Sequence, residues 1–322
     1  MTILITGVAG FIGSQVARAL MAKGEEVVGI DNFSPFYDPV LKFARLKPLK
    51  DSKGFTFIEA DIADRDVMLA LADKHRGIDR IVHLAAQPSV KHANVDPFIY
   101  AHTNVMGHLV VLELAHQLPV LRHLVYASSS SVYGANRKLP FSVEDRVDHP
   151  VSLYAATKRS GELMSETYAH LHRMKITGLR YFTVYGPWGR PDMSPYIFAK
   201  AIHEGATIPL FHLGFVKRDF SYIDDIVAGT LLALDKPAAQ PGHRLYNLGA
   251  AHSEDIVKVV GLFEKAIGRK AIVELKPGEP GDMQETAADI AATTREFGWT
   301  PRVTVEEGIP KFVEWFRAYN RL

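Results

Sequence analysis

The chain has 322 residues and a formal net charge of +1, with 47% hydrophobic and 23% charged residues. The length allows one large domain or two small ones, and the balanced charge predicts no polyanion-binding surface, so nucleic acid is not an expected partner. Without an 18-residue apolar run, a signal peptide pattern or any cysteine, the sequence predicts neither a membrane span nor disulfides and fits a cytoplasmic protein.

The first predicted elements are a strand, a glycine loop and a helix. Thr2–Thr6 is short, β-branched and apolar, as is typical of a buried parallel strand. GVAGFIG follows, with Gly7, Gly10 and Gly13, and a helical pattern extends from Ser14 to Lys23. The glycines permit a tight turn and the close approach of a pyrophosphate to the helix N-terminus, where free N–H groups favour anions.

The second predicted strand, EEVVGID, ends in Asp31, 24 residues after Gly7. An acid at this position can accept hydrogen bonds from an adenosine ribose. It would also repel a 2′-phosphate, which favours NAD over NADP. The pattern therefore predicts an NAD site; the alternative is a glycine-rich turn that binds nothing.

Strand and helix patterns continue to alternate. FTFIEADIAD (Phe55–Asp64) predicts a strand and a helix start, with Asp61 and Ile62 where an adenine ring would lie. The alternative for these two residues is a helix cap and a core residue. RIVHLAAQP predicts a strand whose end carries Ala85 and Ala86, small residues that let a cofactor pass close to the backbone.

The rest of the first half completes the predicted sheet. PFIYAHTNVMGHLVVLELAHQ predicts one long helix that contains Asn104. HLVYASSSSVYG predicts a strand that runs into four serines, and ITGLRYFTVYGP predicts a further strand. Six strand signals separated by helices or loops predict an α/β fold with a doubly wound parallel sheet of the Rossmann type. Ligands bind at the carboxyl ends of such strands. The residues expected at or just after these ends are Gly7, Asp31, Asp61, Ala85, Ser129, Tyr154 and Thr183.

Tyr154 and Lys158 lie four residues apart in VSLYAATKRSGE, so a helix would present both on one face. A phenol titrates near pH ~10, which is too high for a base at neutral pH. A nearby ammonium favours the phenolate and lowers the pKa of Tyr154, which makes it a usable acid/base. The pair predicts proton transfer to and from a hydroxyl; the alternative is a chance pair on an amphipathic helix.

The second half contains shorter, mixed elements. Residues 186–195 are rich in Pro and Gly and predict a loop, followed by a helix from Asp224, a short strand in RLYNLG and an amphipathic helix in SEDIVKVVGLFEKAIG. The last 20 residues contain another helix. We expect an NAD-binding Rossmann domain over residues 1–185 and a smaller mixed α/β substrate-binding lobe over 186–322, some segments of which return to the core.

Four motifs, TGVAGFIG, ASSSSVYG, YAATK and RYFTVYGP, in this order and spacing resemble the extended short-chain dehydrogenase/reductase family over essentially the whole chain. Within it the sequence is similar to NAD-dependent nucleotide-sugar epimerases. RYFTVYGPWGRPDM, KRDFSYIDDIV and PGDMQETAAD look most like UDP-glucuronate 4-epimerases. The resemblance implies reversible C4 epimerisation of UDP-glucuronate to UDP-galacturonate through a 4-keto intermediate, with NAD as cofactor and a UDP-sugar bound mainly by the second lobe.

The resemblance also implies roles for individual residues. Ser129 matches the family's catalytic Ser/Thr, Tyr154 its acid/base, and Lys158 the partner that also holds the nicotinamide ribose. The positions in the family's cofactor region are Gly7, Gly10, Phe11, Ile12, Gly13, Asp31, Asn32, Asp61, Ile62, Leu84, Ala85, Ala86, Asn104, Ser128, Tyr154, Lys158 and Tyr181.

Two further positions match substrate contacts of the family. Arg218 matches an arginine that pairs with the UDP diphosphate, whose oxygens a planar guanidinium binds bidentately. The alternative is a surface salt bridge with Asp219 or Asp224. Asp282 falls in a loop that closes over UDP, and Glu279 stands where some relatives carry a second phosphate-binding arginine.

The loop before VYG carries only hydroxyls, Ser128–Ser131, where related dehydratases and decarboxylases place an acid. This argues against dehydration and purposeful decarboxylation. Thr183 stands where many galactose epimerases have Asn, and we expect Ser130, Ser131 and Thr183 to hold a sugar carboxylate out of the geometry in which a β-keto acid loses CO2. Arg190 is the candidate cation for that carboxylate; its alternative is an exposed loop arginine.

Other functions stay open at the sequence level: a neutral-sugar epimerase acting on UDP-glucose and UDP-galactose, a net oxidoreductase that consumes NAD, and a non-catalytic cofactor sensor. The sensor would be expected to have lost Ser129, Tyr154 or Lys158. The 14 histidines lack metal-ligand spacing, so no metal is expected. The resemblance implies a homodimer formed through the helices that carry Asn104 and Tyr154.

Overall fold

The computed structural model describes residues 1–278 and 283–322, which form two compact units. Unit 1 consists of Met1–Gly134, Arg146–Arg180 and Val227–Tyr246. Unit 2 consists of Ala135–Asp145, Tyr181–Ile226 and Asn247–Leu322. The chain therefore passes between the units more than once.

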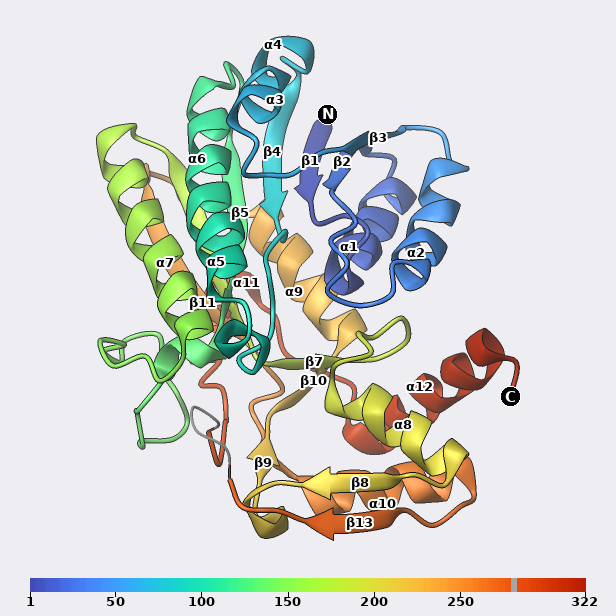
Figure 1. The fold of residues 1–322 in the computed structure, drawn as a ribbon. Helices are drawn as coiled ribbons and strands as arrows, with labels where there is room; N and C mark the ends of the chain where they lie inside the picture. The colour runs from blue at the N-terminus through green and yellow to red at the C-terminus, as the bar shows by residue number, and fades with distance from the viewer. Residues whose placement is uncertain (279–282) are drawn as a thin grey trace. The chain divides into compact units, whose positions relative to one another are not determined.

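A seven-stranded sheet forms the centre of unit 1, in the order β11-β6-β5-β4-β1-β2-β3 (Figure 1). Its strands are β1 (Thr2–Thr6), β2 (Glu26–Asp31), β3 (Phe55–Glu59), β4 (Ile78–His83), β5 (His123–Ser129), β6 (Lys175–Tyr181) and β11 (Gly242–Leu248), with the last residues of β6 and β11 in unit 2. The pairs from β3 to β5 are parallel, and Thr6 stands opposite both Ile30 and His83. The strand order reverses at β1, which confirms the predicted doubly wound parallel sheet and places its switch point there.

The helices of unit 1 lie on both faces of this sheet. They are α1 (Phe11–Ala22), α2 (Val40–Lys50), α3 (Arg65–Leu69), α4 (Leu71–Lys74), α5 (Pro97–Tyr100), α6 (Gly107–Gln117) and α7 (Leu153–Leu171), with short 3₁₀ turns η1 (His92–Asn94) and η3 (Ser130–Tyr133). Helices α3, α4, α6 and α7 enclose one layer of core, in which Leu4 and Ile81 of the strands meet Met68 and Leu112. Burying each such side chain contributes about 1.5–3 kcal/mol. Right-handed crossovers place α1 and α2 on the opposite face, against β1–β3.

The segment from Pro97 to Gln117 differs from the single α-helix that its sequence predicts. It begins as α5, widens into the π-helical segment η2 (Ala101–Met106) and continues as α6, which lies beside α7 (Figure 1). A π-helical turn adds one residue per turn and rotates the side chains around it, and such turns are frequent at functional sites. Asn104 lies inside this turn and is buried.

ITGLRYFTVYGP also differs from its prediction as one strand, because the chain leaves the central sheet at Phe182. The segment divides into β6 and β7 (Thr183–Tyr185), and β7 pairs in parallel with β10 (Phe220–Tyr222) in unit 2. The Phe182 N–H bonds the Leu248 carbonyl (3.1 Å), and the next residue, Thr183, bonds the Asp219 carbonyl (3.0 Å). The backbone thus changes partners between adjacent residues, a long-range event that local periodicity does not encode.

Unit 2 has the mixed α/β content that its sequence predicts. Its other elements are α8 (Ser194–Glu204), β8 (Thr207–Leu210), η4 (His212–Gly214), β9 (Lys217–Arg218), β12 (Glu254–Asp255), α10 (Ile256–Ile267), β13 (Ile272–Leu275), α11 (Ala291–Phe297) and α12 (Val305–Asn320). Helix α9 (Ile223–Asp235) begins in unit 2 and ends in unit 1. Phe198, Phe263, Phe312 and Phe316 pack edge to face or stacked in the core of the unit. Within residues 1–278 and 283–322, no helix has the length and apolarity needed to cross a bilayer, and no group of three or more His, Asp or Glu side chains is arranged to hold a metal ion.

Candidate active site

The glycine loop between β1 and α1 is packed too tightly for side chains at its glycines. Gly7 has a φ of +73°, and its N–H bonds the Ile30 carbonyl at 2.7 Å. A Cβ at Gly7 would lie 2.7 Å from the backbone nitrogen of Ala85, and a Cβ at Gly13 would lie 2.1 Å from the Gly7 carbonyl oxygen. Glycine is therefore required at Gly7 and Gly13 for the loop to reach both the helix and the end of β4.

The N-terminus of α1 carries no side-chain cap. Gly10 is the N-cap residue, and the first turn has no acidic side chain. The N–H groups of Phe11, Ile12 and Gly13 have no acceptor within the helix, because the first turn of any α-helix leaves its donors unpaired. An uncapped, glycine-lined helix start with a positive dipole end fits a pyrophosphate.

Asp31, at the end of β2, is more heavily engaged than its sequence position suggests. It is buried, one carboxylate oxygen accepts from Ala9 N–H (3.0 Å), and the other accepts from Phe33 N–H (2.9 Å). The Lys42 ammonium of α2 lies 3.8 Å from the carboxylate. Burial lowers the pKa of Lys42, and the charge of Asp31 opposes this effect. Asp31 thus fixes the glycine loop, and its contact with a ribose stays a prediction.

The predicted adenine edge is linked by hydrogen bonds. The Asp61 carboxylate accepts from the Asn32 side-chain amide (3.0 Å) and from Ala63 N–H (2.8 Å). Ile62 is buried in the core, and the N-cap of α3 is Asp64. The ends of β2 and β3 are therefore held together where the sequence places the adenine.

Asn104 connects the loop after β4 to α7. Its side-chain oxygen accepts from Gln87 N–H (2.7 Å), and its amide donates to the Gln87 carbonyl (3.0 Å) and to the Thr157 hydroxyl (3.1 Å). Thr157 in turn donates to the Tyr154 carbonyl (2.9 Å). Because both amide hydrogens are used in this way, Asn104 acts on the site by holding the loop that contains Leu84, Ala85 and Ala86 against the helix that carries Tyr154.

Helix α7 presents Tyr154 and Lys158 one turn apart, as predicted. Ser152 caps the helix by accepting from Ala155 N–H (3.1 Å). The Lys158 ammonium donates to the Ala127 carbonyl near the end of β5 (2.8 Å), and the ring of Tyr154 packs edge-on against Tyr100. Burial lowers the pKa of Lys158 to about 8, and the charge of Glu162 opposes that shift. Lys158 therefore links the helix to the strand end while remaining largely charged at neutral pH.

The four serines at the end of β5 and the start of η3 have different hydrogen-bonding roles. The Ser128 hydroxyl is buried and donates to the Glu162 carboxylate (2.6 Å), so it is held inside the protein. The Ser129 hydroxyl accepts from Ser131 N–H (3.2 Å) and caps η3. Ser130 and Ser131 are half-buried. Ser128–Ser131, Tyr154 and Lys158 all belong to unit 1.

The other predicted substrate residues belong to unit 2. Thr183 is half-buried at the start of β7. Tyr181, which was predicted in the cofactor region, is buried at the end of β6. The Arg190 guanidinium forms a two-point ion pair with Asp192 (3.0 and 2.6 Å), and its contact with a sugar carboxylate stays a prediction. Arg218 donates to the carbonyls of Lys217 (3.0 Å) and Gln284 (3.1 Å). Asp282 and Glu279 lie outside the described residues.

Three buried charged residues were not predicted to support the site, although Asp219 was named as a possible partner of Arg218. Asp219 accepts from Ala250 N–H (2.6 Å) and Ala288 N–H (3.0 Å), which joins distant segments of unit 2. Glu162 and Arg180 form a two-point ion pair in unit 1 (2.8 and 2.9 Å). Glu162 could have been found from its spacing, because it lies one helical turn after Lys158 and two turns after Tyr154.

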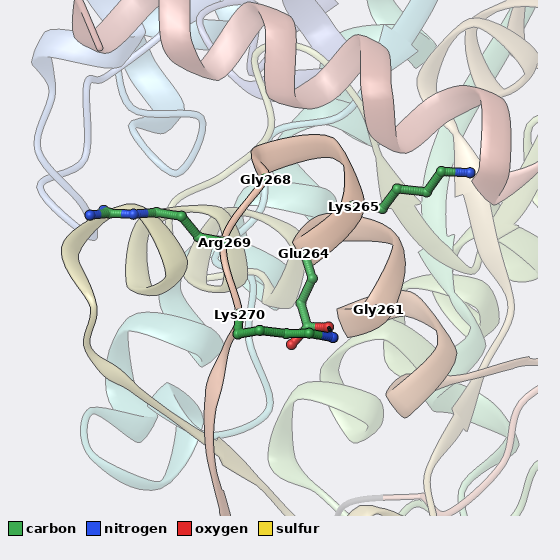
Figure 2. Close-up of a pocket in the computed structure, with 6 residues that line it drawn as sticks. All are labelled: Gly261, Glu264, Lys265, Gly268, Arg269 and Lys270. Atoms are coloured by element: carbon green, nitrogen blue, oxygen red, sulfur yellow. Dashed lines mark hydrogen bonds and ion pairs between the residues drawn. The ribbon is translucent and has the colours of Figure 1, made fainter.

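A surface pocket of about 240 Å³ at the end of α10 contains none of the predicted site residues. Figure 2 shows Lys265 and Arg269 pointing away from it in opposite directions, while Glu264 and Lys270 meet at one side. That ion pair measures 2.8 Å, and Arg269 donates to the His203 carbonyl. These partners stabilise the helix end and supply no group for catalysis.

Comparisons with known proteins identify a family and several similar structures. Residues 3–249 match the model of the NAD dependent epimerase/dehydratase family. UDP-glucuronate 4-epimerase 4 of Arabidopsis thaliana is 42% identical over 332 residues, which cover 99% of this chain and 76% of the relative. A crystal structure of UDP-glucuronic acid 4-epimerase from Bacillus cereus in complex with UDP-glucuronic acid and NAD is similar with a TM-score of 0.92 and 34% identity, over 99% of this chain and 100% of that one. A UDP-glucose 4-epimerase from Thermotoga maritima with UDP-glucose gives 0.89 and 31%, over 99% and 100%.

Proposed function

The chain belongs to the NAD dependent epimerase/dehydratase family, and we propose that it interconverts UDP-glucuronate and UDP-galacturonate by inverting C4. The observation that carries the proposal is the stripe of Tyr154 and Lys158 on α7, anchored at the end of β5 beside a loop that offers hydroxyls and no acid. The full-length similarity to the Arabidopsis and Bacillus UDP-glucuronate epimerases supports the choice of sugar.

NAD is the cofactor of this family, and the residues of unit 1 fit it. The uncapped start of α1 suits the pyrophosphate, and the glycine loop has no side chain in the way. When bound, NAD supplies reversible hydride transfer at the sugar carbon, so the reaction is redox-neutral overall. The protein therefore has to move one proton and hold the sugar.

Tyr154 is the proposed acid/base. As phenolate it takes the proton of the sugar 4-hydroxyl, and as phenol it returns the proton after the sugar has turned over. The Lys158 ammonium favours the phenolate, and Ser129 donates a hydrogen bond to the same sugar oxygen as its charge changes. These roles make C4 the reacting carbon and leave the rest of the sugar to other residues.

Ser130, Ser131 and Thr183 are proposed to bind the C5 carboxylate, and Arg218 the UDP diphosphate. The hydroxyls hold the carboxylate away from overlap with the 4-ketone, which suppresses loss of CO2. Thr183→Val should therefore release a UDP-pentose product beside the epimer, measured by mass spectrometry of the reaction mixture. Ser142→Ala, a hydroxyl loss at another site in unit 2, serves as the control. A clean epimer from the Thr183 variant would contradict the role.

A second candidate is epimerisation of UDP-glucose and UDP-galactose. The ion pair between Arg190 and Asp192 favours it, because a guanidinium already bound at two points by a carboxylate is less available to a sugar carboxylate. The similarity to the Thermotoga UDP-glucose epimerase is compatible with it. Both candidates use the same catalytic residues and differ in the C5 substituent.

The deciding experiment incubates the purified protein with UDP-glucuronate or UDP-glucose, with and without added NAD, and follows the anomeric proton by NMR. Conversion of UDP-glucuronate to UDP-galacturonate, without net NADH or CO2, is the expected result. Conversion of UDP-glucose alone would select the second candidate. Stoichiometric NADH would identify a net oxidoreductase instead.

A homodimer is proposed on the helical face of unit 1. Phe98 of α5 is 84% exposed, and Leu163 and Leu171 of α7 are 53% and 65% exposed, an unusual apolar content for an open surface. Light scattering should give twice the monomer mass of 35.7 kDa, and Leu163→Glu should halve it. Leu322→Glu, at the chain end, is the control. A monomeric wild-type protein would contradict the proposal.

The cytoplasmic location and the lobe boundaries at 185/186 stay predictions.

A further inference from the structure

Glu162 occupies the third position of the stripe on α7 that carries the acid/base pair. It lies one helical turn beyond Lys158 and two beyond Tyr154, and its side chain is buried. Its carboxylate accepts from Ser128 Oγ (2.6 Å), Arg159 Nη1 (3.0 Å) and both Nε and Nη2 of Arg180 (2.8 and 2.9 Å). A buried carboxylate with four donors is a fixed negative charge.

The Glu162 carboxylate is connected to the end of β5, where the catalytic groups gather. Ser128 lies between Ala127, whose carbonyl receives the Lys158 ammonium, and Ser129, the proposed hydrogen-bond donor to the sugar. Arg180, on the adjacent strand β6, stacks over the ring of Tyr133 in η3 (4.9 Å), so the ion pair also supports the far end of the serine loop. Glu162 thus contacts the supports of Lys158 and Ser129 without reaching a sugar.

The charge of Glu162 also acts on Lys158. Burial lowers the pKa of Lys158 to about 8, and Glu162 is the opposing influence. Burial alone would raise the pKa of Glu162, but its bonds to Arg180, Ser128 and Arg159 lower it overall, so it is ionised at neutral pH. Without this anion the ammonium would lose its proton at a lower pH, and an amine cannot favour the Tyr154 phenolate.

Four other buried ionisable groups near the pair have pKa values shifted away from that of Lys158. His83 of β4 and His108 of α6 face Lys158; burial lowers the pKa of His108 to about 3 and that of His83 well below its ordinary value. Facing Glu162 are Tyr126 of β5, whose pKa burial raises, and His243 of β11, whose pKa burial lowers against the pull of Glu166. Against the effect of burial, the bonds and charge of Glu162 raise the pKa of Arg180. The charge of Lys158 acts in turn on Tyr154, the proposed acid/base, so the titration of Lys158 itself is the direct report on Glu162.

We propose that Glu162 is a positioning residue of the epimerisation site, which keeps the Lys158 ammonium charged and fixes the end of β5 through Ser128. The catalytic consequence rests on the proposed function, whereas the effect on Lys158 does not. The residue touches no substrate in this scheme; it acts through Lys158 and Ser129.

The test measures the protonation of Lys158 directly. The full-length protein is labelled with 13C at lysine Cε, and the Lys158 signal, assigned by its loss in Lys158→Met, is followed against pH by NMR. The wild-type midpoint is expected near 8, and Glu162→Gln should lower it by about one pH unit or more. Glu166→Gln makes the same charge change one turn further along α7, where the side chain is 66% exposed, and should leave the midpoint in place.

Glu162→Gln leaves Arg180 buried without its anion, which can prevent folding. The double variant Glu162→Gln/Arg180→Gln removes both partners and carries the test in that case. An unchanged midpoint in the folded variant overturns the proposal, because a merely structural role would change the amount of folded protein and not the titration of Lys158.

The pH profile of UDP-glucuronate turnover completes the experiment. The alkaline limb of kcat should move to lower pH in the Glu162 variant by the same amount as the midpoint, with KM little changed. A shifted midpoint in a protein that converts neither UDP-glucuronate nor UDP-glucose would contradict the proposed function and leave the role of Glu162 towards Lys158 standing. A shifted midpoint with an unmoved alkaline limb would overturn the catalytic part of the inference.

Discussion

The N-termini of α1 and α7 differ in what happens to the unpaired backbone N–H groups of their first turn. Both begin just after the carboxyl-end loops of the central sheet, and both leave backbone donors unpaired in their first turn. At α7, the Ser152 hydroxyl accepts a hydrogen bond from one of these N–H groups. At α1, the N-cap residue is Gly10, which has no side chain to accept one. A capped helix start presents side chains further along, and an uncapped one keeps its own N–H groups for an anion.

The comparison separates two kinds of site residue in unit 1. On α7 the chemistry lies in the side chains of Tyr154 and Lys158, and the helix end only holds them in place. At α1 the anion is expected to bind to backbone N–H groups. Gly7 and Gly13 contribute because they lack a side chain, which allows the backbone to pack closely there. Substitutions on α7 should therefore impair the reaction by removing a functional group. Substitutions in the glycine loop before α1 should impair it because the added side-chain atoms do not fit.

The largest expected effect is that of Tyr154→Phe. Removing the hydroxyl eliminates proton transfer at the sugar 4-oxygen, so turnover of UDP-glucuronate should fall by roughly 10²–10⁴-fold or more. Calorimetric binding of UDP should be nearly unchanged. Tyr168→Phe removes the same atom from the same helix, where the hydroxyl bonds Glu113, and should keep its activity. Near wild-type turnover in the Tyr154 variant would remove the acid/base role from α7.

Gly7→Ala tests the other side of the comparison. An alanine there adopts a φ of +73° and places its Cβ 2.7 Å from the Ala85 nitrogen, so the loop must move. We expect the free energy of unfolding to fall by roughly 1–3 kcal/mol and NAD affinity to fall at least about tenfold, measured by denaturant titration and calorimetry. Gly24→Ala is a matched control, because Gly24 has a φ of +82° but open space around it. Equal losses in the two variants would show that backbone strain, rather than close packing, explains glycine at Gly7.

The same contrast explains how much of the molecule its sequence predicts. The sheet, the glycine loop, the strand end at Asp31 and the stripe of Tyr154 and Lys158 follow from local patterns, because strand, turn and helix periodicities are short-range. The seven-stranded order and the family similarity confirm the fold and the cofactor class.

What the sequence does not reveal is which charged side chain pairs with which in the folded protein. Lys42 beside Asp31 and Asp192 beside Arg190 each change what a predicted residue is free to do, and the pair of Arg180 and Glu162 was not predicted at all. Even Asp192, only two residues from Arg190, leaves no periodic signal in the chain. The π-helical turn around Asn104 is similarly invisible, since its sequence has an ordinary helical pattern.

The smallest expected effect is that of Ser152→Ala. This variant tests most directly whether the start of α7 is only structural while the start of α1 binds a ligand. Loss of the cap leaves the Ala155 N–H unpaired and should reduce the free energy of unfolding by about 1 kcal/mol, measured by denaturant titration. Ser160→Ala, in the interior of the same helix where the hydroxyl bonds the Ala156 carbonyl, should change stability by less, because alanine is the better helix former. Turnover by the Ser152 variant should stay close to wild type, because Lys158 remains anchored to Ala127. If turnover instead falls as far as in Tyr154→Phe, the start of α7 takes part in the reaction, and the division between a structural and a ligand-binding helix end does not hold.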